Sequence, residues 1–140
     1  MKYNDTEQWT ELKLAFKDEK LKEDIKTNYN LTIHKGLQDK HIYGTANFNQ
    51  ELDNGNYKSY LKEGIDPYEL VDKYACTGKF IRSKNGKWTN KEIVTVNKII
   101  GYSYDRKIKK YVETNRFMIH YSKNKGTHVV PRGKEDNNDF

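Results

Sequence analysis

The first segment of the chain, residues 5–28, carries apolar side chains at helical spacing on two nearly opposite faces. One face holds Trp9, Leu12 and Phe16, and the other holds Leu14, Leu21 and Ile25. Two arrangements explain this pattern. Either the helix breaks near "KDEK", where Asp18 would cap a second helix, or one continuous helix lies between two partners. We prefer the break.

The next segment alternates short apolar runs with turn residues. In residues 30–36, Leu31 and Ile33 alternate with polar residues, which predicts a short strand. Further along, Thr45 follows a glycine and precedes a run with helical spacing. It therefore predicts the N-cap of a short helix over residues 46–52.

Two more helices are predicted before the character of the chain changes. The stretch "YKSYLKEG" (57–64) predicts a short helix that ends at its glycine. The stretch "DPYELVDKYA" (66–75) has Asp66 as a predicted N-cap and Pro67 at the first helical position, where a proline is well tolerated.

The second half of the chain is rich in β-branched and aromatic residues, which favour strands. Strands are predicted over residues 92–105, 109–122 and 127–131, with turns at "KNGKW" and "DRKIKK". Residues 133–140 are polar and predict a flexible tail. Helices followed by an antiparallel meander indicate an α+β fold, with N-terminal helices and then a small antiparallel sheet.

The stretch "RFMIHYSKNKGTHVVP" (116–131) reads as a hairpin with histidines on both strands. A three-residue loop "NKG", with Gly126 left-handed, would place Ser122 opposite His128 and His120 opposite Val130. Side chains alternate between faces along a strand, so one face would carry His120, Ser122 and His128, and the other Tyr121 and Thr127. A two-residue loop would instead separate the histidines.

Two imidazoles on one exposed face suit general acid–base catalysis, in which a neutral ring takes a proton and a charged ring gives one. Cleavage of RNA by its own 2′-hydroxyl needs such a pair and a cation for the charge that develops on the phosphate. The candidate cations are Arg116, Lys123 and Lys40. The alternative is that each histidine is a hydrogen-bonded structural residue.

The loop "DKHIYGT" (39–45) is the second candidate for chemistry. Lys40 and His41 lie between a predicted strand and a predicted helix, where loops often present functional groups. Gly44 and Thr45 would offer donors to an anion at the start of that helix. The alternative is a simple capping loop. His34 lies inside a predicted strand, and we interpret it as structural.

Composition narrows the class of partner. Residues 1–74 hold 11 Lys/Arg and 14 Asp/Glu, a net charge of −3, whereas residues 75–140 hold 15 and 6, a net charge of +9. A basic half with interleaved aromatic residues is typical of proteins that bind polyphosphate chains. No run approaches the roughly 18 apolar residues of a membrane span, so we expect no membrane partner.

A metal centre is not expected. The chain has one cysteine, Cys76, which excludes a cysteine cluster, and it has no histidine pair at the i, i+4 spacing of a helical zinc motif. No acidic residue lies within five positions of His120 or His128. We therefore expect catalysis, if present, without metal or another cofactor.

Four stretches together resemble a known family. "KGLQDKHIYGTANFNQEL", "DPYELVDKYACTGK", "KIIGYSYD" and "IHYSKNKGTHVVP" are similar, in this order, to the type-50 polymorphic-toxin domain, over about residues 33–132. That family occurs at the C-termini of bacterial secreted toxins and on some phage minor head proteins. It belongs to the barnase–EndoU–colicin–RelE-like endoribonucleases. The resemblance implies metal-independent RNA cleavage on a small α+β fold with an antiparallel sheet.

The motif residues of the family fall, by position, on Lys40, His41, Thr45, His120, Tyr121, Ser122, Thr127 and His128. The chain departs from the family pattern at a few positions. Tyr43 replaces a frequent proline, Cys76 replaces the glycine of "YAGTG", and Phe117 and Met118 replace smaller residues. None of these changes removes a candidate catalytic group.

The predicted organisation is a helical segment (1–30), a nuclease-like toxin domain (31–132) and the tail (133–140). The expected function is an endoribonuclease in which His41, His120, His128 and Ser122 carry the catalysis. The expected substrate-binding residues are Lys40, Thr45, Arg116, Tyr121, Lys123 and Thr127. The alternative is a non-catalytic nucleic-acid-binding or phage-head-associated module that keeps the fold.

The resemblance also implies a setting for the domain. We expect an RNA substrate, a cognate immunity protein, and a phage or secretion-system carrier. The site of action would be the cytoplasm of a bacterial target cell.

Overall fold

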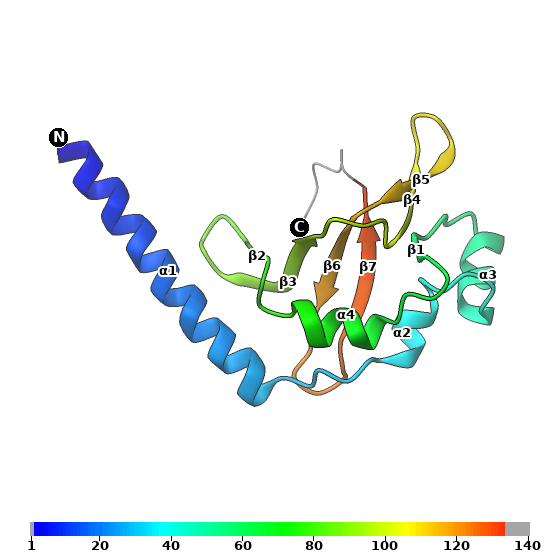
Figure 1. The fold of residues 1–140 in the computed structure, drawn as a ribbon, viewed down its shortest axis with the longest axis horizontal. Coiled ribbons are helices and arrows are strands. Elements are labelled where there is room, and N and C mark those ends of the chain that lie inside the picture. Colours follow the sequence, from blue (N-terminus) through cyan, green and yellow to red (C-terminus); the bar gives the residue numbers. More distant parts are fainter. Residues whose placement is uncertain (1, 134–140) are drawn as a thin grey trace.

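Helices dominate the first half of the chain and antiparallel strands the second (Figure 1), which confirms the α+β class. The computed structural model describes residues 2–133, without the side chains of residues 2–9. Apart from Gly133, the predicted flexible tail lies outside the described residues.

The N-terminal segment is one continuous helix, α1 (Lys2–Asn28), so the predicted break near Asp18 is wrong. The Asp18 carboxylate caps no helix and instead forms an ion pair with Arg82, at 2.7 Å. Only the end of α1 joins the core, through Leu21 and Ile25. The rest extends away from the body of the protein (Figure 1), and Leu12 and Phe16 are exposed.

Three short helices follow: α2 (Lys35–Asp39), α3 (Ala46–Asp53) and α4 (Pro67–Tyr74). The predicted caps are confirmed, because the Thr45 hydroxyl accepts from the amide of Phe48 and the Asp66 carboxylate from the amide of Tyr68. The strand predicted over 30–36 is wrong. That segment makes one isolated bridge, between Ile33 and Thr127, and then enters α2.

The strands form two separate antiparallel sheets rather than one meander. The four-stranded sheet has the order β2 (Lys79–Arg82), β3 (Trp88–Thr95), β6 (Arg116–His120) and β7 (His128–Arg132). The three-stranded sheet has the order β1 (Tyr60–Leu61), β4 (Gly101–Asp105) and β5 (Lys110–Thr114).

Two sequence predictions fail because of this division. Each long predicted strand is split between the sheets, with 92–105 giving β3 and β4, and 109–122 giving β5 and β6. The helix predicted over 57–64 is wrong, because Tyr60 and Leu61 pair with β4 instead.

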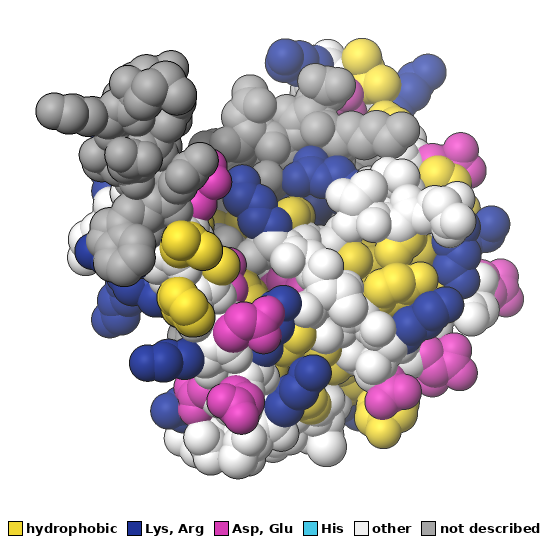
Figure 2. All heavy atoms as spheres, turned by 60° about the vertical axis from the view of Figure 1, so that its left-hand side comes forward, with side chains coloured by type: hydrophobic (Ala, Val, Ile, Leu, Met, Phe, Trp, Pro, Cys, Tyr) yellow, Lys and Arg dark blue, Asp and Glu magenta, His cyan; other side chains and the backbone are white. Residues whose placement is uncertain are grey.

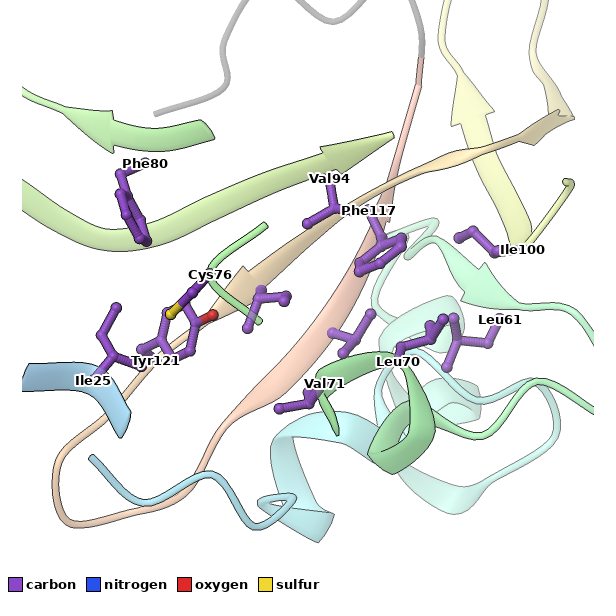
Figure 3. Close-up of a cluster of buried hydrophobic side chains, with 12 residues drawn as sticks. Ile25, Leu61, Leu70, Val71, Cys76, Phe80, Val94, Ile100, Phe117 and Tyr121 are labelled. Carbon is purple, nitrogen blue, oxygen red and sulfur yellow. The ribbon is translucent and has the colours of Figure 1, made fainter. Parts of the chain in front are cut away.

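The main core lies on one face of the four-stranded sheet, beneath α4 and the end of α1 (Figure 3). Phe117, Ile119 and Tyr121 point into it from every second position of β6 and the residue after it. The intervening positions face the other way. Met118 packs there with Ile81 and Ile93 in a smaller cluster, and His120 follows on the same face. The alternation therefore leaves His120 outside the main core.

A buried carboxylate fixes the loop after α4. Glu92 is fully buried and accepts hydrogen bonds from the amides of Cys76 and Gly78 and from the hydroxyl of Tyr121. Cys76 has a φ of 68°, in the left-handed region that favours glycine. Such charge-assisted bonds hold the loop against the sheet.

Candidate active site

His120 and His128 are direct partners in the antiparallel pairing of β6 with β7. Their rings are nearly parallel, at an interplanar angle of 23°, and the centroids are 4.6 Å apart. The prediction that the two histidines share a face is therefore confirmed. The predicted register is wrong, because His120 lies opposite His128 rather than Val130.

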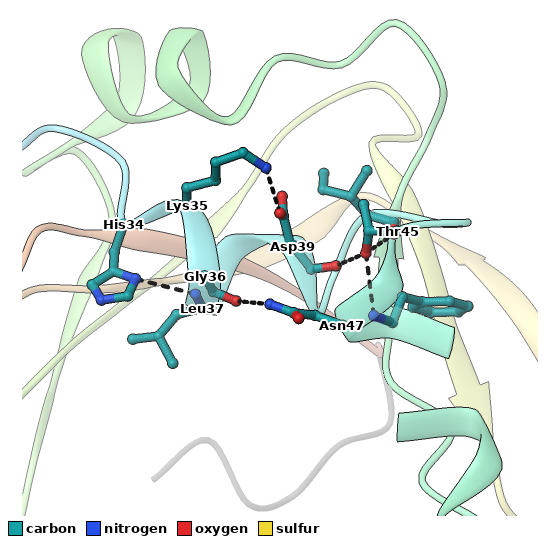
Figure 4. Close-up of polar contacts among 9 residues, drawn as sticks. His34, Lys35, Gly36, Leu37, Asp39, Thr45 and Asn47 are labelled. Atoms are coloured by element: carbon teal, nitrogen blue, oxygen red, sulfur yellow. Dashed lines mark hydrogen bonds and ion pairs between the residues drawn. The ribbon is translucent and has the colours of Figure 1, made fainter. Parts of the chain in front are cut away.

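The third ring comes from a distant segment. His41 follows α2, and its ring lies 6.1 Å from that of His128 at an angle of 16°. We call His41, His128 and His120, in this spatial order, the histidine row. The loop that carries His41 is held by the Thr45 hydroxyl, which donates to the carbonyl of Asp39 (Figure 4). A separate backbone bond joins the amide of Leu61 to the carbonyl of His41.

The tautomer of His41 follows from its neighbour. Its Nδ1 lies 2.9 Å from the carbonyl oxygen of Ser59. A carbonyl only accepts, so Nδ1 carries the proton, and Nε2 keeps a lone pair for another partner. His41 thus has one nitrogen anchored to the protein and one suited to accept a proton.

Gln38 docks α2 against the open edge of β7. Its side-chain nitrogen donates to the carbonyl of Val129, and its side-chain oxygen accepts from the amide of Val129. Gln38 is buried, so these bonds replace the strand partner that β7 lacks at this edge. The two hydrogen bonds between Gln38 and Val129 hold α2 so that His41, which follows it, lies beside His128. Sequence analysis missed this role, although Gln38 lies in the motif "KGLQDKH".

Burial keeps the row neutral at pH 7. It lowers the pKa of His41 to about 4, of His128 to about 4 and of His120 to about 3. Positive charge adds to the effect, because Lys91, and His128 when it is protonated, lower the pKa of His120, and Lys58 and Lys40 lower the pKa of His41. The hydrogen bond to the carbonyl of Ser59 acts in the opposite direction and raises the pKa of His41. Each ring is therefore able to accept a proton, and an added anion nearby would favour the charged form.

Lys91 extends the arrangement on the other side. It is the register partner of His120 on β3, so Lys91, His120 and His128 occupy adjacent positions of neighbouring strands. Directly opposed residues project from the same face of a sheet. Lys91 is thus the cation nearest to the row by register. Its proximity depends on pairing between β3 and β6, and no local sequence signal indicates it.

The loop between β6 and β7 is longer than predicted. It spans residues 121–127, and the Ser122 hydroxyl accepts from the amide of Lys125 within it. Gly126 is left-handed as expected, with a φ of 96°. The loop is tied to the segment before α2, since the Thr127 amide donates to the carbonyl of Thr32 and the Thr127 hydroxyl to that of Asn30.

Several predicted binding residues have other contacts in this structure. Tyr121 and Thr127 are buried, and the Thr45 hydroxyl is engaged in capping. Arg116 lies at the far end of β6 from His120, about 13 Å along the strand, and donates to the carbonyl of Gly133.

Two predicted cations remain near the surface. The Lys40 ammonium lies 3.9 Å from the Glu51 carboxylate, beside the His41 loop. The Lys123 ammonium lies 5.5 Å from the ring centroid of Tyr29. Lys40 is the one with an electrostatic effect on both His41 and His128.

His34, interpreted from sequence as structural, caps α2. Its Nδ1 accepts from the amide of Leu37 (Figure 4), and its own amide donates to the carbonyl of Thr127. It is a positive neighbour of His128 when protonated. All four histidines therefore gather around the start of β7, but His34 has a local structural task.

The row is poorly arranged to share a metal ion. Imidazole lone pairs lie in the ring plane, so lone pairs of near-parallel rings do not converge on one point. Within residues 2–133, no three His, Cys, Asp or Glu side chains are grouped to hold a metal. Among the same residues, no helix is long and apolar enough to span a membrane.

A surface cavity near α2 does not include the histidine row. A cavity of about 360 Å³ lies between α2 and the start of α4, lined by residues that include Ile33, Ile42 and Pro67. None of the three row histidines lines it. We place the site at the row because titratable groups with strongly shifted pKa values and a fixed tautomer converge there.

Comparison with known proteins identifies the family. A search of curated proteins found no match, and a search of solved structures found none. A family model described as "Bacterial toxin 50" matches residues 33–131, a segment that contains the whole histidine row. Because this match covers more than half of the chain, the protein belongs to the bacterial toxin 50 family.

Proposed function

We propose that the domain over residues 31–132 is a metal-independent endoribonuclease, in which the histidine row moves the protons and the RNA 2′-hydroxyl is the nucleophile. The observation that carries this proposal is the meeting of three near-parallel imidazoles from two distant segments, each neutral at pH 7. A histidine with only a structural role needs its own hydrogen-bond partner, but it does not need two other imidazoles beside it.

His41 is the better-placed general base. Its Nδ1 proton is committed to Ser59, so Nε2 accepts the 2′-hydroxyl proton as the 2′-oxygen attacks phosphorus. Its low pKa keeps this nitrogen unprotonated at neutral pH. A lower pKa also makes His41 a weaker base, and the proximity of the bound substrate offsets this loss.

One hairpin histidine, His120 or His128, is the proposed acid. It donates a proton to the 5′-oxygen as the bond from phosphorus to that oxygen breaks. Both rings are neutral in the free protein, so the acid must gain its proton with the substrate. A bound phosphodiester is an anion, and an opposite charge within a few ångströms raises a histidine pKa.

Cations complete the proposed site. Lys91, the neighbour of His120 across the sheet, stabilises the charge that develops on the phosphorane. Lys40, next to His41, is a second phosphate ligand once the substrate competes with Glu51. The roles predicted for Ser122, Arg116 and Lys123 have no support from their positions, and we do not assign them to the reaction.

The family membership supports a biological setting of the same kind. We further propose that the domain acts in the cytoplasm of a bacterial target cell, that a phage or secretion system delivers it, and that an immunity protein blocks it in the producer. These proposals rest on the toxin family alone.

The reaction is tested with a defined oligonucleotide in EDTA. We expect products with 2′,3′-cyclic phosphate and 5′-hydroxyl ends, and no cleavage of DNA or of an oligonucleotide methylated at every 2′-oxygen. Products with 5′-phosphates, or efficient cutting of DNA, would contradict the proposal. RNA binding without any cleavage would instead favour the non-catalytic module.

A further inference from the structure

The three-stranded sheet carries tyrosines on one face. Tyr60 of β1 pairs with Tyr102 of β4, and Tyr104 of β4 pairs with Tyr111 of β5. Residues two apart on a strand share a face, and so do direct partners, so all four rings project from the same side. The reaction proposed above uses none of them.

These rings join two exposed tyrosines from loops into a continuous series. Tyr43 lies 5.2 Å from Tyr60, which lies 5.0 Å from Tyr111. Tyr111 lies 5.3 Å from Tyr104, whose ring stacks on Tyr57 at 4.4 Å and 15°. We call Tyr43, Tyr60, Tyr111, Tyr104 and Tyr57 the tyrosine row.

The two ends of the tyrosine row are open to solvent, and its middle is held in place. Tyr43 is 69% exposed and Tyr57 is 52% exposed, whereas the three rings between them are partly buried. The Tyr111 hydroxyl donates to the carbonyl of Lys58. An exposed ring that packs against fixed neighbours offers a flat face at a low entropic cost to a ligand.

The segments that carry Tyr43 and Tyr60 are joined to His41 through the backbone. Tyr43 is two residues beyond His41, and Tyr60 follows Ser59, whose carbonyl accepts the Nδ1 proton of His41. The amide of Leu61 donates to the carbonyl of His41. The end of the tyrosine row at Tyr43 is therefore carried by the same loop as His41, and a ligand bound at His41 would meet this end first.

Basic side chains line the far end. The turn between β4 and β5 exposes Arg106, Lys107 and Lys109, and Lys110 at the start of β5 is exposed as well. The carboxylate of Asp105, at the end of β4, accepts from the amides of Lys107 and Ile108. Glu113, on the face of the tyrosine row beside Tyr102, is an exposed acid. The net charge of this rim is positive, which suits a phosphate backbone.

The face of the molecule that is turned forward in Figure 2 has a different character. On the face turned forward in Figure 2, basic and acidic side chains are interspersed with hydrophobic ones. A mixed surface of that kind is ordinary for a soluble domain.

We propose that the tyrosine row is a base-stacking subsite for single-stranded RNA, beside the scissile phosphate. The identity of the ligand rests on the proposed function. Aromatic rings bind successive bases through their π-faces, while nearby cations hold the backbone, and such binding needs little sequence preference. Bases in a duplex are already stacked on each other, so the subsite selects single strands.

The test measures binding of a fluorescent RNA hexanucleotide in which every 2′-oxygen is methylated, so that cleavage plays no part. We expect Tyr57→Ala and Tyr43→Ala each to weaken binding roughly 5- to 150-fold. Tyr57→Phe keeps the ring and should bind like the unchanged protein. Tyr68→Ala is the matched control, because Tyr68 is 54% exposed on α4, outside the tyrosine row.

Two further probes separate stacking from charge. An abasic oligonucleotide of the same length keeps the phosphates, and we expect its weaker binding to be insensitive to Tyr57→Ala. Blunt duplex RNA should be insensitive as well. Equal losses for the abasic and the normal strand would overturn the subsite, as would unchanged binding by both alanine variants when circular dichroism shows them folded.

The result is independent of catalysis. If the protein cleaves no RNA but Tyr57→Ala weakens binding of the methylated strand, the subsite stands and the proposed reaction fails. If cleavage follows the proposed chemistry but neither variant affects binding, the reaction stands and the subsite fails. If the alanine variants keep RNA binding intact but lose binding to a protein partner, the tyrosine row is a protein-binding surface and the RNA subsite is overturned.

Discussion

The rings of His120 and His128 lie 4.6 Å apart because the two residues are direct partners across β6 and β7. Antiparallel pairing brings directly opposed Cβ atoms to about 4.5–5.5 Å, so the stacking is a product of register rather than of the loop that joins the strands. With His41 on the outer side of His128, the row concentrates three groups of like charge whenever they are protonated.

Stability should therefore fall as the pH falls below the ordinary histidine range. Folding lowers the pKa of all three row histidines, so the folded state binds fewer protons than the unfolded chain. The free energy of unfolding therefore has its full value, as far as these histidines are concerned, above about pH 6.5, and it decreases as the pH falls toward 3–4. Each such histidine contributes a slope of about 1.4 kcal/mol per pH unit inside that window.

The contribution of one ring is measured by urea unfolding of the unchanged protein and of His120→Asn between pH 7 and pH 4.5. The variant should lose stability less steeply with acid, because one titrating group is gone. Carboxylates also titrate in this window, but they are common to both proteins. Parallel curves for the two proteins would mean that His120 has an ordinary pKa in the folded state.

Gln38 is expected to act as a positioning residue. Gln38→Leu removes both bonds to Val129 and leaves a buried amide and carbonyl unpaired, at a cost of about 1–3 kcal/mol. If Gln38 sets the distance from His41 to His128, the variant should lower kcat more than it raises KM. Gln50→Leu, on the exposed side of α3, is the control. A loss of stability with unchanged kcat would make Gln38 purely structural.

Cys76 offers a test of backbone strain. Its φ of 68° lies in the left-handed region, which is unfavourable for residues with a side chain. Cys76→Ala keeps the strain and removes the sulfur, whereas Cys76→Gly relieves the strain. We expect the glycine variant to be more stable than the alanine variant by about 0.5–1 kcal/mol in chemical denaturation. An alanine variant of equal or greater stability would show that the loop does not bear this strain.

The face of the histidines was predictable from sequence, but their register was not. The predicted and observed pairings of β6 with β7 differ by two residues, and a shift of two keeps every side chain on its face. The length of the loop depends on its bonds to Thr32 and Asn30, which lie some ninety residues earlier in the chain. The sequence of the hairpin alone does not indicate that contact.

Other features depended equally on distant pairing. The caps at Thr45 and Asp66 were predictable because capping is local. The division into two sheets, the role of Lys91 and the bonds of Gln38 all arise between segments far apart in sequence. The continuity of α1 was missed for the same reason, since Asp18 pairs with Arg82.

The motif residues divide into two groups in the structure. His41, His120 and His128 come together, whereas Tyr121, Thr127 and Thr45 make internal hydrogen bonds that shape the loops around them. A family motif alone does not distinguish the two, because it names residues by position and not by what their side chains contact. Burial and hydrogen-bond partners make the distinction.

The proposed reaction requires the histidine row as its catalytic group. The decisive measurement is kcat/KM for a defined RNA substrate with His41→Ala, His120→Ala, His128→Ala and His34→Asn, the last of which keeps an N-cap acceptor for α2. We predict a loss of roughly 10²–10⁴ for His41→Ala and for at least one hairpin variant, as expected for a general base and a general acid. His34→Asn should stay within a few-fold of the unchanged protein. Full activity in all three row variants, or an equal loss in His34→Asn, would contradict the account.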